Sequence, residues 1–283
     1  AAPEDVDELR AVVGASEPAA AQLARLAKAE FDAEQFEASE KTARKALELD
    51  AGDPTALTVL IKVFARRINT LHPSDPKARA LEDEILPLAR RLMEVEPDGW
   101  VAPKVVAFVA LGRNELGVAK EPLQKLQRAC PSDPYSWSGL AAIYLDAGDD
   151  EAALPQLLEL ARIEANDPDI PAKIADLYRR RGNLGEASYW YRQGLAIDPF
   201  SVPMHEAFGG VLMQMNDYSG ALREYHMLTR IEPEGARHFE RAAVAAKREG
   251  DLNAAREYAT RAVEIDPESP ARNLLDAQPQ PSP

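Results

Sequence analysis

A step of 34 residues repeats along this chain and constrains its fold more than any other feature. Each step ends in a short helical pattern followed by proline at five places and by alanine at the sixth. A period of this length indicates one supersecondary unit copied along the chain, in which each copy buries its apolar face against the next. The marking residues are Pro97, Pro131, Ala165, Pro199, Pro233 and Pro267.

Two further positions of the unit follow the same step. Twelve residues before each of the last five marks stands an alanine, and a small residue repeated at one place predicts two helices in close approach. Seventeen residues before each of the same five marks stands Gly or Asn, the residues that tolerate the left-handed conformation after a helix end. Each unit is therefore predicted to be helix, turn, helix, turn. The alanines are Ala119, Ala153, Ala187, Ala221 and Ala255, and the helix stoppers are Asn114, Gly148, Gly182, Asn216 and Gly250.

The unit at 134–167 carries a recognisable signature. Its matching residues are Trp137, Leu140, Ala141, Tyr144, Gly148 and Ala153. In this spacing the unit resembles the tetratricopeptide repeat family, and the later units keep parts of the same pattern, such as Phe208 and Tyr225 in 202–235. The resemblance implies an all-α fold, a right-handed solenoid of antiparallel helix pairs. It also implies that the first helix of every unit lines a concave groove.

The repeats are expected to fill residues 20–269, with a cap at each end. The second unit carries 12 extra residues, because the step from Ala51 to Pro97 is 46 residues rather than 34. We expect two long helices there, a loop at 71–75 and a kink at Pro87. The insertion is interpreted either as a neutral surface loop or as a protruding helix pair that widens the groove or touches a partner. The expected segments are a capping helix at 1–19, seven repeats at 20–53, 54–99, 100–133, 134–167, 168–201, 202–235 and 236–269, a cap at 270–276 and a disordered tail at 277–283.

Composition and charge exclude several classes of function. The formal net charge of −14 and the pI near 4.9 argue against nucleic-acid binding, which needs a basic face. No apolar run is long enough for a membrane span. The sequence has no phosphate-binding loop, nucleophile elbow or zinc spacing, and its four histidines fit helix surfaces or helix packing. We therefore expect no cofactor, no metal and no enzymatic activity. The chain does not begin with Met, so we expect residue 1 to be a processing site or an artificial boundary, and no cellular compartment is indicated.

The resemblance places the second, fifth, ninth and twelfth residues of each unit on the concave side, as one stripe along the first helix. Over 100–167 this stripe is mostly apolar and aromatic, which is the composition of an interaction hot spot. The alternative is that these side chains pack on a neighbouring helix or on the N-terminal segment. The partner-binding residues expected here are Val101, Lys104, Phe108, Leu111, Tyr135 and Leu145.

The later part of the stripe is charged and mixed. Cations there either hold an acidic residue or carboxyl terminus of a ligand, or pair with carboxylates of the groove itself. The carboxylates available for such pairing are Asp169, Asp176, Glu206 and Glu240. The partner-binding residues expected in this part are Arg179, Met213, Arg237, Arg241 and Lys247.

The function that these patterns favour is a scaffold for protein–protein interaction. Its ligand is expected to be a protein or peptide segment held in the groove, apolar with an acidic end. Two alternatives stay open at this point. The chain is a self-association module that forms a homo-oligomer, or it is the non-catalytic arm of a larger enzyme or of a secretion or assembly protein.

Overall fold

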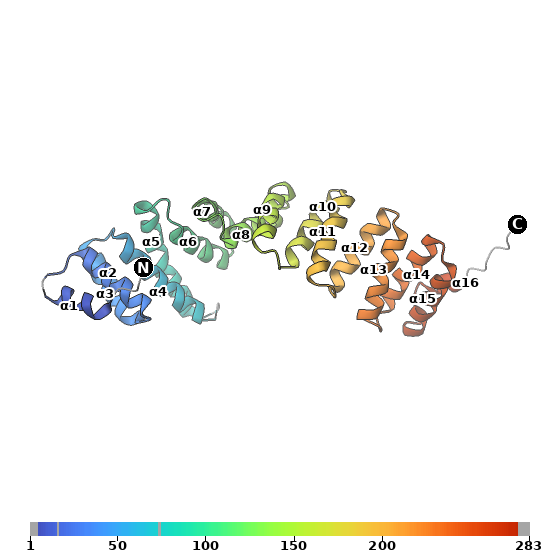
Figure 1. Ribbon diagram of the computed structural model, residues 1–283, viewed down its shortest axis with the longest axis horizontal. Coiled ribbons are helices and arrows are strands. Elements are labelled where there is room, and N and C mark those ends of the chain that lie inside the picture. Colours follow the sequence, from blue (N-terminus) through green and yellow to red (C-terminus); the bar gives the residue numbers. More distant parts are fainter. Residues whose placement is uncertain (1–4, 16, 73–74, 277–283) are drawn as a thin grey trace. The chain divides into compact units, whose positions relative to one another are not determined.

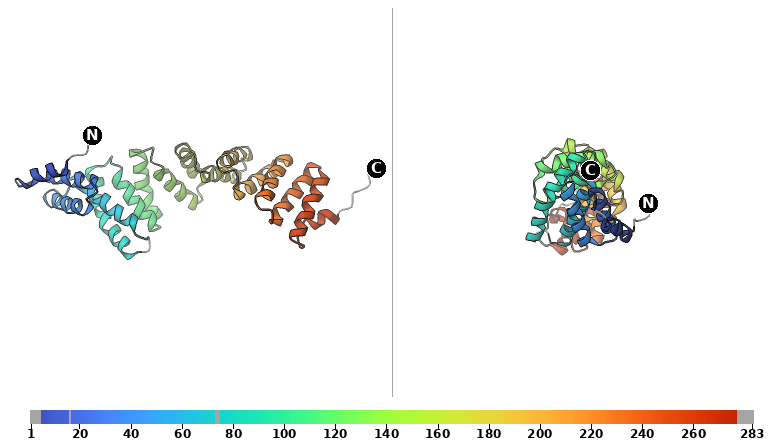
Figure 2. Two further views of the ribbon diagram at one scale, coloured as in Figure 1. Left: turned by 60° about the horizontal axis from the view of Figure 1, so that its bottom comes forward. Right: turned by 90° about the vertical axis from the view of Figure 1, so that its left-hand side faces the viewer.

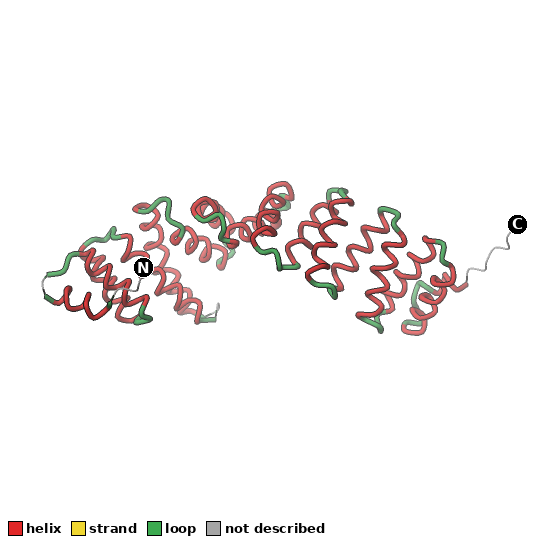
Figure 3. The backbone as a smooth tube through the Cα atoms, in the orientation of Figure 1, coloured by secondary structure: helices red, strands yellow, loops and turns green. Residues whose placement is uncertain are grey.

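The computed structural model describes residues 5–15, 17–72 and 75–276. These ranges contain sixteen α-helices and no strand (Figures 1 and 3), so the predicted all-helical fold is confirmed. The chain divides into two compact units, unit 1 at 1–149 and unit 2 at 150–283. Figure 2 shows the helices of each unit from two other directions. The tail predicted at 277–283 lies outside the described residues.

Unit 1 contains eight helices, and helices next to each other in the chain pack side by side. The bounds of the two helices of the second repeat agree with the long pair expected from the sequence. The loop expected at 71–75 falls between them, although its residues 73–74 are outside the described ranges. The helices are α1 (Val6–Gly14), α2 (Ala20–Asp32), α3 (Phe36–Leu49), α4 (Pro54–Thr70), α5 (Pro76–Val95), α6 (Val101–Gly112), α7 (Leu116–Ala129) and α8 (Pro134–Asp146).

Unit 2 repeats the same local pattern and ends in a short helix. That last helix packs on the one before it, where an end cap is expected. The helices are α9 (Asp150–Ile163), α10 (Asp169–Arg180), α11 (Leu184–Ile197), α12 (Val202–Gln214), α13 (Tyr218–Ile231), α14 (Ala236–Glu249), α15 (Leu252–Ile265) and α16 (Arg272–Asp276).

Side chains and backbone conformation fix where the helices begin and end. Asp53, Asp75 and Asp133 each accept a hydrogen bond from a backbone N–H of the first helical turn, and proline follows each of them. An acceptor at this place satisfies a donor that the helix leaves free, and proline at the next place has no donor to lose. The five predicted stoppers all adopt positive φ, from 58° at Asn114 to 96° at Gly250. One further residue, Glu34, does so without being Gly or Asn, with φ 59°.

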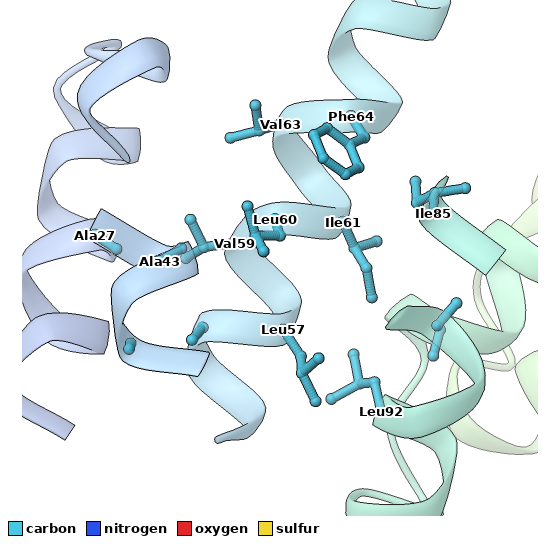
Figure 4. Packing of buried hydrophobic residues seen from close by; sticks show 14 of the residues in the cluster. Ala27, Ala43, Leu57, Val59, Leu60, Ile61, Val63, Phe64, Ile85 and Leu92 are labelled. Atoms are coloured by element: carbon cyan, nitrogen blue, oxygen red, sulfur yellow. The ribbon is translucent and has the colours of Figure 1, made fainter. Parts of the chain in front are cut away.

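The core of unit 1 is centred on α4, which contacts α2, α3, α5 and α6. Its buried side chains spread around much of the helix, as a helix with neighbours on several sides requires. Leu57, Ile61 and Phe64 point toward Ile85 and Leu92 of α5, and Val59 lies on the side of Ala43 of α3 (Figure 4).

The insertion in the second repeat is helical, since it lengthens α4 to 17 residues and α5 to 20. Ion pairs connect these helices to their neighbours. Arg113, at the end of α6, donates to Glu82 at 2.9 Å and to Asp83 at 2.7 Å. The Arg67 side chain pairs with Glu40 of α3 at 2.6 Å. The extra residues are therefore part of the stack rather than a loose surface loop.

The repeated alanines lie at tight helix contacts. Four of the five are 0% exposed and Ala255 is 4% exposed. In unit 2 the core around them is partly aromatic, with the Tyr191 and Phe208 rings stacked at 6.1 Å between centroids. Gly209 of α12 permits a closer approach still, because a Cβ placed there would lie 2.5 Å from Cε1 of Tyr225.

Candidate functional site

The candidate site is the surface made by the first helix of each helix pair, which we call the inner face. In unit 1 it is formed by α2, α4, α6 and α8, and in unit 2 by α10, α12 and α14. Each unit carries a hollow on its own inner face. We describe the two inner faces separately.

In unit 1 the inner face of α6 and α8 holds the predicted apolar stretch. Phe108 is 42% exposed and is the most open of its apolar side chains. Leu111 and Tyr135 are half-buried against the cluster of Ala107, Leu123 and Leu140. Leu111 and Tyr135 therefore pack on the core, and only part of each side chain is accessible to a partner. The side chains of Val101 and Leu145 are also half-buried.

Lys104 is held in place rather than free. Its Nζ pairs with Asp133 and lies 5.7 Å from the Tyr135 ring and 5.9 Å from the Trp100 ring. Aromatic rings attract a cation through their negative faces. Burial, and then the negative charge of Asp133, raise the pKa of Tyr135 to about 12, so this phenol stays neutral.

A hollow of about 350 Å³ lies beside this stretch, between α2, α4 and the start of α6. Its lining includes Trp100, which is 46% exposed, together with Phe31, Lys28 and Lys62. These residues are not among the predicted ones, because the predicted stripe does not extend to the first two repeats. The signal was available, since Lys28, Phe31 and Lys62 fall in the same register of those repeats.

In unit 2 the hollow has about 310 Å³ and lies between α12, α14 and the residues leading into α16. We call it the cap pocket. Its lining is mostly apolar and includes Val244, whose side chain is 43% exposed. Of the predicted site residues the structure brings Met213 and Arg241 together here. The lining residues are Met213, Tyr225, Glu240, Arg241, Val244, Pro270, Ala271, Asn273 and Leu274.

Two of the predicted cations are paired inside the chain. Arg241 pairs with Glu206 at 2.9 Å, and its guanidinium carbon lies 6.0 Å from the Tyr225 ring centre. Arg179 pairs with Asp176 at 2.9 Å, and the same carboxylate accepts from the Tyr191 hydroxyl at 2.6 Å. Both arginines are therefore held in one orientation.

The other two cations, Arg237 and Lys247, are exposed on α14 and have no ion pair within the described part of the chain. The cap pocket also carries Glu240, whose carboxylate accepts from the Ser269 hydroxyl at 2.7 Å. The charge of the pocket lining is thus mixed, because it contains the cation Arg241, paired with Glu206, and the carboxylate of Glu240.

Two histidines of unit 2 are buried, as expected for packing residues. His205 lies between Glu224, 2.7 Å from Nδ1, and the Pro199 carbonyl oxygen, 3.0 Å from Nε2. Both partners are acceptors, so the imidazolium, with two N–H donors, fits this place best. Burial alone would lower the pKa of His205, but the two acceptors outweigh it and raise the pKa. Trp137, two repeat steps earlier, donates in the same way to the Pro131 carbonyl at 2.8 Å.

Within the described residues no group of three or more His, Cys, Asp and Glu side chains is arranged to hold a metal ion. A search of the same residues finds no helix that is both long and apolar enough to cross a membrane.

Comparisons with known proteins agree with the repeat assignment. A family profile described as Tetratricopeptide repeat matches residues 207–270. The human protein named Tetratricopeptide repeat protein 7B is 24% identical over 226 residues, which is 75% of this chain and 27% of that protein, so the chain spans about a quarter of its relative. The crystal structure of MamA protein is similar with a TM-score of 0.51 and 15% identity, covering 63% of this chain and 96% of that one, which is a likeness of fold. These matches show tetratricopeptide repeats at residues 207–270, and the 34-residue period and stacked helix pairs give the rest of the described chain the fold of tetratricopeptide repeat proteins.

Proposed function

We propose that this protein is a non-catalytic scaffold that holds a segment of a partner protein against its inner faces. Tetratricopeptide repeat proteins generally act as scaffolds that bind peptides or proteins, and this is the coarse function that the fold supports. The cap pocket carries the finer proposal. It is a mostly apolar hollow on the predicted binding face, and its lining includes the cation Arg241.

The cap pocket takes an apolar side chain of the partner. Met213, Val244 and Leu274 supply apolar walls, and burying a side chain among them gains about 25 cal/mol for each Å² of apolar surface removed from water. An acidic group next to that side chain is held by Arg241 of the pocket or by the unpaired Arg237 and Lys247 on the same helix. An arginine that is already oriented loses little freedom when it binds a carboxylate.

The inner face of unit 1 supplies a second contact. Phe108 is its anchor, because it is the most open of the predicted apolar residues there. Changing Phe108 and Tyr135 together to Ala is expected to weaken partner binding by on the order of 2–4 kcal/mol if both are anchors. Circular dichroism of the variant separates this effect from unfolding, because a half-buried Tyr135 also supports the core.

The proposal is tested on a purified partner, first obtained by affinity capture and identified by mass spectrometry. Val244→Glu places a carboxylate in the cap pocket, and we expect it to lower the affinity of the partner at least tenfold. Leu252→Glu is the matched control, since Leu252 is 58% exposed and lies at the start of α15, outside the pocket lining. Equal affinity for the wild type and the Val244 variant would show that the cap pocket is not the binding site.

A further inference from the structure

His238 is a buried histidine with one ring nitrogen that has no hydrogen-bond partner. The residue is 5% exposed, and its Nδ1 is the buried side-chain atom without a partner among the described residues. Its Nε2 lies 2.7 Å from a carboxylate oxygen of Glu232. A carboxylate accepts, so we assign a hydrogen to Nε2, and in the neutral form of the ring Nδ1 is then a lone pair without a donor.

Nδ1 faces a carboxylate rather than a donor. The nearest charged atom is Oε1 of Glu206, 3.7 Å away, which is too far for a hydrogen bond. The Nδ1 lone pair and Oε1 of Glu206 are both acceptors, so neither can donate a hydrogen bond to the other. A proton added to Nδ1 would make it a donor to this carboxylate. Buried nitrogens without a partner are uncommon and call for an explanation of this kind.

The same oxygen of Glu206 forms an ion pair with Arg241. Oε1 lies 2.9 Å from Nη1 of Arg241, and Arg241 lines the cap pocket. Glu206 therefore stands between a cation that it already contacts and a histidine that it would reach by moving less than about 1 Å. These two contacts compete for one carboxylate.

We propose that Glu206 couples ligand binding in the cap pocket to protonation of His238. A ligand carboxylate that binds Arg241 releases Glu206, which then accepts a hydrogen bond from protonated Nδ1. A proton taken from solvent forms the new Nδ1–H bond, up to one proton for each ligand carboxylate bound, and no other covalent bond changes. This inference rests on the proposed function of the pocket, and it adds the ligand's chemistry, a carboxylate beside an apolar side chain, and its regulation by pH.

Three charged groups face or adjoin this histidine. Glu232 comes from the turn between α13 and α14, Glu206 from α12, and Arg241 from the histidine's own helix. Arg241 acts on this site in two ways, because it holds Glu206 and adds a positive charge on the same helix. Neutralising Arg241 with a ligand carboxylate removes both effects at once. By reciprocity, protonation of His238 strengthens ligand binding.

The coupling is tested first without a ligand. In Arg241→Ala the released Glu206 should bind His238, so the titration midpoint of the His238 ring, followed by NMR, should rise by on the order of one pH unit. In Arg241→Ala with Glu206→Gln this rise should be absent. Arg237→Ala is the matched control, because Arg237 is exposed and unpaired in the described chain. A single variant that folds normally and titrates like the wild type would overturn the coupling.

The second test uses a defined probe, the peptide N-acetyl-Ala-Ala-Leu with a free carboxyl group, and its C-terminal amide as control. Calorimetry of the whole chain should show that the acid binds with uptake of a proton and loses affinity up to about tenfold per pH unit in alkaline solution. The amide and the His238→Gln variant should show no such slope. Binding of the acid without proton uptake overturns the coupling. No binding of either peptide at any pH overturns the proposed pocket, while the variant titration still decides the coupling.

Discussion

Two adjacent glycines of α12 should respond to the same substitution in opposite ways. At Gly209 an added Cβ would lie 2.5 Å from Cε1 and 2.8 Å from Cζ of Tyr225, whereas at Gly210 it would meet no atom within 4 Å. Tyr225 is 5% exposed, so its rigid ring has little room to move. The two positions are in one helix and differ in their neighbours, because Gly209 faces the Tyr225 ring and Gly210 has free space beside it.

The magnitudes follow from two opposing terms. Replacing Gly by Ala inside a helix stabilises it by about 1 kcal/mol, because the unfolded chain loses freedom. Overpacking a tight core costs about 1–3 kcal/mol. Gly210→Ala should therefore raise the free energy of unfolding by about 1 kcal/mol. Gly209→Ala combines both terms and should lower it by about 0–2 kcal/mol.

Urea unfolding followed by circular dichroism measures the difference between the two variants, with the wild type alongside. Comparing neighbours in one helix cancels errors that both share, such as residual structure in the unfolded chain. If Gly209→Ala is as stable as Gly210→Ala, the close contact between α12 and Tyr225 is not tight, and the packing argument fails.

Three other expectations concern stability. Glu34→Gly should stabilise unit 1 by about 1 kcal/mol, because a non-Gly residue at φ 59° is strained, and an unchanged urea midpoint would count against that strain. Arg113→Ala should cost about 2 kcal/mol by leaving Glu82 without its partner, with Arg128→Ala on the exposed end of α7 as the control. The pKa of His205 is raised on folding, so its stabilisation is full below the unfolded pKa and is lost as pH rises through the folded one. The stability difference between wild type and His205→Gln should therefore shrink on going from acid to alkaline solution, and a constant difference would refute this assignment.

The fold was predictable because its determinants are local and repeated. The five stoppers adopt positive φ and the five alanines are buried, and both follow from side-chain size and backbone freedom at one place in the unit. Glu34 shows where such rules end, since its left-handed turn is imposed by the neighbouring helices on a residue that does not favour it.

The exposure of the candidate binding face was less predictable, because exposure depends on the distance between helices. Leu111 and Phe108 are three residues apart in the same predicted stripe, yet Leu111 packs on the core and Phe108 remains open. Gly139 of α8 explains part of the difference. It lies so close to Leu123 and Leu111 that an added Cβ would be 3.0 Å and 3.4 Å from them, and this lets Leu111 sink between the helices. A stripe drawn on one helix does not contain that information.

The charged part of the face shows a second limit, which concerns pairing rather than exposure. Internal pairing accounts for two members of the basic cluster, and ligand binding by the others stays a prediction. Arg179 and Arg241 have carboxylate partners inside the chain, whereas Arg237 and Lys247 lack an ion pair in the described residues. In the coupling that we propose, the Arg241 pair also bears on recognition, because its Glu206 lies 3.7 Å from an unpartnered nitrogen of His238. Glu206, which pairs with Arg241 in the free chain, would then also be the group that links ligand binding at Arg241 to protonation of His238.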